Sequence, residues 1–150
     1  MNFVQVKDIL RLIHAASRRL VGVYEGRWAE VSDPAIRWCL KRAIAHERSA
    51  QASIERYLEQ APEHVLGGWF QSVGVWRLDE VMAEVTQAPL RTSAEAAALV
   101  VRCHEAFIET YRHLCAQAFS RDVGRVLGGL LGARQERSRR HAWQSLRTLI

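Results

Sequence analysis

The sequence predicts an all-α domain made of two helical hairpins that a long crossover joins, with a short helix inside the crossover. Apolar residues recur at helical spacings over four long segments. Capping and turn residues separate these segments at two short breaks and one long one. A chain of 150 residues fits a single domain, residues 1–150, and such a domain can bury a core without disulfides or metal.

The first hairpin is predicted from two amphipathic segments, Val6–Trp28 and Ala35–Glu59. The break Ser32–Pro34 supplies a capping side chain and a proline that fits the first turn of the second helix. Glu47 lies at the middle of the inner face of that helix. The other residues of this face are Ile36, Leu40, Ala43, Ala50, Ile54 and Tyr57. We therefore expect a carboxylate in a buried position.

The crossover is predicted over residues 61–92, where prolines and glycines interrupt the helical pattern. The segment is nevertheless rich in apolar residues, so we expect it to lie against the domain, with a short helix at Arg77–Gln87. A helix of about 25 residues spans roughly 37 Å, so some thirty residues can return the chain to the opposite end.

The second hairpin is predicted from a capping box, Thr92 and Glu95, followed by a long apolar face through Phe119. His104 falls on that face and Glu105 beside it. The fourth helix is predicted from about Val123 to Thr148. It carries a stripe of small residues that would permit close approach of another backbone, which we expect to be the crossover or, alternatively, a second subunit or another helix of the bundle. The stripe consists of Gly124, Gly128 and Gly132.

Composition and charge favour a soluble, cytoplasmic protein. The net charge is +5, and basic residues crowd the C-terminal end, where a solvated helix face is more common than a nucleic-acid interface. We therefore do not expect nucleic-acid binding. The three cysteines have no metal-site spacing, and we expect neither a signal peptide nor a membrane segment. The basic residues are Arg134, Arg137, Arg139, Arg140 and Arg147.

An internal repeat relates the two hairpins. Each has a tyrosine late in its first helix, Tyr24 or Tyr111, and a Glu-Arg-Ser tripeptide in its second, at Glu47 or Glu136. This arrangement resembles the ferritin-like, rubrerythrin-like superfamily. The segments HEAFIETYRHL and QERSRRHAWQSL resemble a bacterial group of small ferritin-like proteins of uncharacterised function. The resemblance implies a ferritin-like four-helix bundle and a possible ancestral di-iron site.

The di-iron ligand pattern is incomplete in this sequence. Such bundles use a glutamate from each of two helices and a Glu-x-x-His motif from each of the other two. Ser17 and His104 occupy the first pair of positions, while Ala50 and Arg139 replace the two motif histidines. The remaining candidate ligands are Glu47, His104, Glu105 and Glu136, and His14 and His141 can approach them in an altered site for iron, manganese or zinc. Alternatively, Arg139 pairs with Glu47 or Glu136 and fills the space of the metal.

Three functions follow as hypotheses. The first is a non-enzymatic ferritin-like bundle, a homodimer or other homo-oligomer without cofactor, whose role is structural, interaction-based or, by resemblance, stress-associated. The second is a metal-dependent oxidase or peroxide-handling protein with altered ligands around Glu47, His104 and Glu136. The third is a basic accessory module that binds nucleic acid through the C-terminal arginines.

Overall fold

A computed structural model describes residues 3–71 and 76–149, with the backbone alone for residues 71, 76 and 141–149. The described chain is mostly helical, which confirms the all-α prediction at that level. The elements in chain order are β1 (Phe3–Gln5), α1 (Val6–Glu30), α2 (Pro34–Gln60), α3 (Glu63–Leu66), β2 (Trp69–Gln71), α4 (Trp76–Gln87), α5 (Ser93–Ala116) and α6 (Arg121–Leu149).

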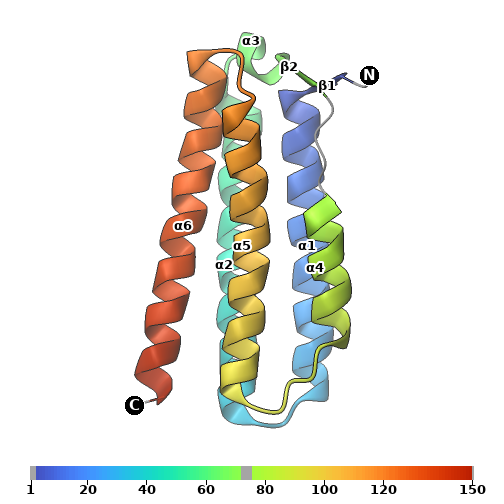
Figure 1. Cartoon of the computed structure of the whole chain (residues 1–150), viewed down its shortest axis with the longest axis vertical. Coiled ribbons are helices and arrows are strands. Elements are labelled where there is room, and N and C mark those ends of the chain that lie inside the picture. Colours follow the sequence, from blue (N-terminus) through green and yellow to red (C-terminus); the bar gives the residue numbers. More distant parts are fainter. Residues whose placement is uncertain (1–2, 72–75, 150) are drawn as a thin grey trace.

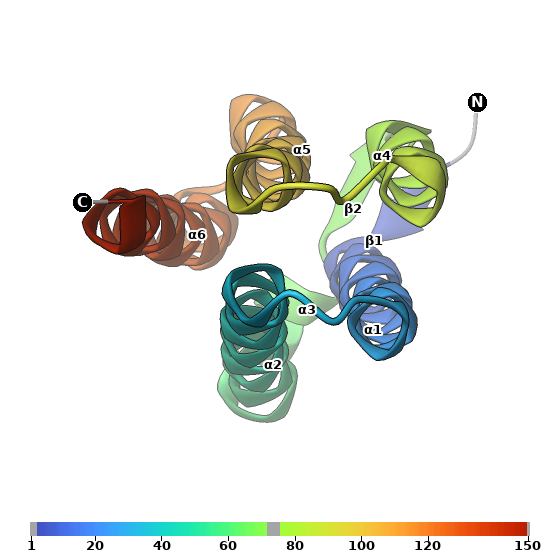
Figure 2. The same cartoon turned by 90° about the horizontal axis from the view of Figure 1, so that it is seen from below.

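Two antiparallel helix pairs, α1 with α2 and α5 with α6, dominate the arrangement (Figure 1). The connection between them carries the chain from one end of the molecule back to the other, so α2 and α5 run in the same direction (Figure 1). Seen end-on, α4 lies beside α1 and α5, and α6 lies against α5 and α2 (Figure 2). The crossover, which also contains the one-turn helix α3, therefore places α4 along the side of the two hairpins.

Local capping explains where the long helices begin. The Asp33 carboxylate accepts hydrogen bonds from the backbone N–H groups of Ala35 and Ile36, at 2.8 and 3.4 Å, and Pro34 occupies the first turn. The Thr92 hydroxyl accepts from the Glu95 N–H at 3.1 Å. The sequence signals thus place the starts of α2 and α5 correctly.

A short antiparallel sheet, which the sequence analysis did not predict, joins the N-terminus to the crossover. Phe3 pairs with Gln71 and Gln5 with Trp69. The Val6 N–H then donates to the Gly68 carbonyl at 2.8 Å, where α1 begins. Strands of three residues are too short to produce a visible alternation of polar and apolar residues, so periodicity could not find them.

The glycine stripe of α6 does not lie against the crossover as expected. Among the described residues, a Cβ added at Gly128 or Gly132 would meet nothing within 4 Å, and one at Gly124 would meet only the Ala118 Cβ, at 3.9 Å. The helix of the crossover, α4, packs on α1 and α5 instead. The described part of the crossover therefore does not make the expected contact, residues 72–75 lie outside the described residues, and the alternative of a second subunit stays a prediction.

The core forms where the inner faces of α1, α2, α5 and α6 meet, and α4 closes one side with Leu78, Met82 and Val85. Two charged side chains, Glu47 and Arg134, are buried within this apolar core. In the part of the chain that is described, no helix is both long and apolar enough to cross a membrane.

Candidate functional site

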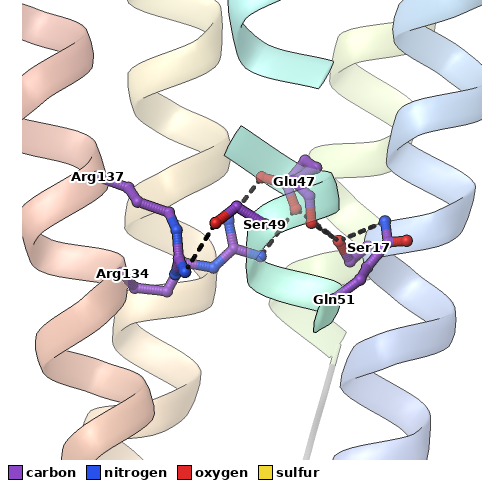
Figure 3. Close-up of polar contacts among 6 residues, drawn as sticks. All are labelled: Ser17, Glu47, Ser49, Gln51, Arg134 and Arg137. Atoms are coloured by element: carbon purple, nitrogen blue, oxygen red, sulfur yellow. Dashed lines mark hydrogen bonds and ion pairs between the residues drawn. The ribbon is translucent and has the colours of Figure 1, made fainter. Parts of the chain in front are cut away.

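A buried ion pair between α2 and α6 is the most unusual feature of the core. The Glu47 and Arg134 side chains are each only 1% exposed. The two terminal nitrogens of Arg134 contact the two carboxylate oxygens of Glu47, with Nη1 to Oε2 at 2.5 Å and Nη2 to Oε1 at 2.8 Å (Figure 3). This two-pronged geometry is the strongest form of side-chain ion pair. It links the first hairpin directly to the second.

The other two long helices complete the environment of the pair. From α1, the Ser17 hydroxyl donates to Glu47 Oε1 at 2.8 Å (Figure 3). Ser17 Oγ in turn accepts a hydrogen bond from the side-chain amide of Gln51, which lies on α2, at 3.1 Å. From α5, the Phe107 ring lies 3.8 Å below the Arg134 guanidinium carbon. An arginine over an aromatic face gains a favourable electrostatic contact. All four long helices thus contribute a side chain to one cluster.

Electrostatics keep both members of the pair charged. Burial alone would raise the pKa of Glu47, but the charge and hydrogen bonds of Arg134, with smaller effects from His104 and Ser17, outweigh it and lower that pKa. Burial likewise opposes the charge of Arg134, and the Glu47 carboxylate more than compensates, which raises the arginine pKa. Because each charge offsets the cost of burying the other, removing one partner alone is strongly unfavourable.

Other chemically capable groups near the pair are held in their neutral forms. Burial raises the pKa of Cys103 to about 12 and raises the pKa values of Tyr24 and Tyr111 above their ordinary range. Tyr24 and Cys103 also hydrogen-bond to each other across α1 and α5. A thiol that stays protonated is a poor nucleophile. The cluster therefore presents no activated nucleophile among these residues.

Arg137, one turn beyond Arg134 on α6, has a different environment. It is half-buried and donates to the hydroxyl of Ser49 at 3.3 Å (Figure 3) and to that of Ser53 at 3.1 Å. Burial and then the Arg134 charge lower the pKa of this side chain. Its hydrogen-bond partners are neutral, so its charge is not balanced by a contacting carboxylate within the described residues.

Of the four candidate metal ligands, two are buried in the core and two lie at the surface. Glu47 and His104 are both buried, and the imidazole is close enough to lower the pKa of the carboxyl. Glu105 is exposed, and Glu136 is about half exposed beside Arg139 and Arg140, at 3.8 and 3.3 Å. The structure therefore brings Glu47 and His104 together and leaves the other two on the surface.

The remaining histidines also differ from one another in position. His14 on α1 has a side chain that is only 19% exposed, and it contacts Glu55 on α2 at 2.8 Å. His46 is half-buried, with its ring 6.1 Å from that of His104. His64 and His113 are exposed. The side chain of His141 lies outside the described residues.

The di-iron pattern implied by the resemblance does not fit this arrangement. Both oxygens of the central carboxylate contact Arg134, whose cation is permanent and repels a metal ion. Within the described residues, no three His, Cys, Asp or Glu side chains gather in a geometry that could hold a metal. Arg139, expected to pair with Glu47 or Glu136, does lie 3.8 Å from Glu136, but at the exposed surface, so it does not fill the space of a metal.

Arg134 is the site residue that the sequence analysis missed. In the sequence it falls among the basic residues of the C-terminal end, and aligning the repeat on the Glu-Arg-Ser tripeptides matches Glu47 with Glu136 instead. Without an insertion, a constant offset of 87 residues relates Ser17 to His104, Tyr24 to Tyr111, and Glu47 to Arg134. All six of these side chains are buried. The ungapped repeat therefore held the signal that identifies Arg134 as the partner of Glu47.

Comparisons of the chain with models of protein families, with curated proteins and with solved structures find no match in any of the three.

Proposed function

We propose that this chain is a non-enzymatic, ferritin-like helical bundle in which the Glu47–Arg134 ion pair takes the place of a di-iron centre. Its role is then structural or interaction-based; a stress-associated role follows from the resemblance alone. The observation that carries the proposal is the two-pronged contact between the buried carboxylate and the buried guanidinium. This contact occupies the acceptor atoms that a metal would need.

The neighbouring chemistry supports a role without catalysis. Cys103, Tyr24 and Tyr111 stay protonated at neutral pH because burial raises their pKa values. The Ser17 hydroxyl donates a hydrogen bond to the Glu47 carboxylate, so it acts as a structural donor in this cluster. A metal-dependent oxidase would require Arg134 to leave the core, which would strand a buried charge.

The arrangement of the C-terminal arginines disfavours the nucleic-acid hypothesis. Arg134 is neutralised in the core, while Arg139 and Arg140 lie beside Glu136. Phosphate binding depends on cations that are accessible on one face. Fewer arginine side chains are thus available to bind phosphate groups than their number in the C-terminal sequence suggests.

Metal titration tests the proposal. Protein purified without a histidine tag is analysed for metal content and then titrated anaerobically with Fe(II), Mn(II) and Zn(II). We expect no stoichiometric metal in the wild type and no saturable binding near the ion pair. Stoichiometric metal that is lost in Glu47→Gln and His104→Ala, and retained in the exposed control Glu105→Gln, would overturn the proposal and favour the altered metal site.

A further inference from the structure

A groove of about 440 Å³ lies between the C-terminal part of α2 and the first half of α6. Its floor is apolar and comes from both helices and the turn that follows α2. The main floor residues are Ala61, Pro62, Val126 and Leu130. The volume falls in the range of small-molecule sites, which are mostly apolar with a few polar groups that orient the ligand.

Small residues on α6 keep this groove open. Gly129 and Ala133 are one helical turn apart and both line it. A Cβ on Gly129 would lie 2.6 Å from the Tyr57 hydroxyl oxygen, so the glycine lets the tyrosine lie across the helix backbone. On this side of the groove α6 therefore has no large side chain at these two positions, which leaves space beside Tyr57.

Two cations flank the groove. Arg56 lines it and is exposed, and it forms no ion pair in the part of the chain that is described. Arg137 donates to the hydroxyl of Ser53, which also lines the groove, and to that of Ser49, and both of these partners are neutral. An apolar floor beside two cations without a carboxylate partner complements a molecule that has an aliphatic chain and an anionic head. Arginine suits a carboxylate head because its N–H groups can form two parallel hydrogen bonds.

We propose that this groove binds a medium-chain aliphatic carboxylate, with the chain on Val126 and Leu130 and the head between Arg56 and Arg137. The inference deepens the interaction role proposed above by giving it a ligand class. It rests on residues outside the ion pair. Metal binding at Glu47 would refute the proposed function and leave this site untouched, whereas a failed ligand titration would refute this site alone.

Calorimetric titration of the full chain with sodium decanoate, below its micelle concentration, tests the site, and 1-decanol serves as the uncharged probe. We expect decanoate to bind at one per chain and decanol at least tenfold more weakly. Arg56→Gln and Arg137→Gln should each weaken decanoate binding about tenfold, because a hydrogen bond to a charged group contributes about that much. Arg18→Gln, an exposed α1 arginine, should leave binding unchanged.

A second variant locates the chain-binding part of the groove. Ala133→Phe should abolish decanoate binding by filling the groove, while Ala98→Phe, at an exposed α5 position, should not. If Ala133→Phe fails to fold, the exposed Arg56→Gln variant still decides the question. The proposal is overturned if decanoate does not bind, if decanol binds equally well, or if Arg56→Gln binds decanoate like the wild type. Binding to phosphatidylglycerol vesicles without binding of free decanoate would overturn it as well.

Discussion

At the scale of single residues, the core of this protein contains a buried ion pair, Glu47 and Arg134, whose opposite charges neutralise each other. Glu47 uses both oxygens on Arg134 and receives a further hydrogen bond from Ser17, and Arg134 rests on Phe107. A buried ion pair is a costly element compared with apolar packing, because both charges lose water. Its retention here sets which faces of α2 and α6 point inward.

The ion pair predicts a specific response to acid. The pKa of Glu47 is lowered in the folded state by Arg134, against an unfolded value of about 4.3. The stabilisation is therefore fully present above the unfolded pKa and is lost as the pH falls through the lower, folded pKa. Urea unfolding from pH 7 to pH 3 should show the wild-type advantage over Glu47→Gln shrinking below about pH 4. An advantage that stays constant down to pH 3 would show that the carboxylate charge is not involved.

The three cysteines should differ in reactivity according to burial. Cys39 and Cys103 are 3% and 1% exposed, and burial raises their pKa values to about 11 and about 12. Cys115 is only half-buried. We expect iodoacetamide at pH 8 to label Cys115 alone in the native protein and all three cysteines in urea, as read by peptide mass spectrometry. Native labelling of Cys103 at the rate of Cys115 would contradict the closed core.

At the scale of elements, the glycines of α6 fall into two groups with opposite predictions. Alanine at Gly128 or Gly132 meets open space, so each substitution should stabilise the helix by up to about 1 kcal/mol. Alanine at Gly129 forces the Tyr57 hydroxyl to move and should gain less or destabilise. Urea unfolding combined with light scattering measures both effects. Loss of stability together with dissociation of a dimer in Gly128→Ala would instead identify the stripe as a subunit interface.

Helix positions were predictable from the sequence because the apolar period and the caps agree. The predicted ends of the long helices lie within three residues of the observed ones, and Thr92 and Asp33 cap as expected. The partner of Glu47 was not predicted, because the Glu-Arg-Ser match shifted α6 by two residues and so turned a different face inward. The offset of 87 residues corrects that shift.

Tertiary contacts of the surface elements escaped prediction for a different reason. The groove between α2 and α6 depends on which small residues face Tyr57, and the β1–β2 pairing depends on three-residue strands. Periodicity along one helix defines its buried face, but it does not specify which neighbour that face meets. Glu105 and Glu136 illustrate the same limit, since both lie near the edge of a predicted inner face and are exposed.

At the scale of the whole molecule, the ion pair joins two hairpins whose other contacts are mainly apolar, apart from the hydrogen bonds of Arg137 to Ser49 and Ser53. The first hairpin supplies Ser17 and Glu47, and the second supplies Phe107 and Arg134 (Figure 3 shows three of these four). The pseudo-repeat places complementary charges at equivalent positions. The pair therefore fixes how the two halves dock.

A double-mutant cycle on Glu47 and Arg134 tests this claim most directly, with the free energy of unfolding in urea as the readout. Glu47→Leu and Arg134→Met should each cost about 3–5 kcal/mol, because each leaves one buried charge without its partner. The double variant should recover most of that loss, since two apolar side chains of similar volume need no partner. Losses that simply add in the double variant, or single variants that cost less than about 1 kcal/mol, would contradict a coupled buried pair.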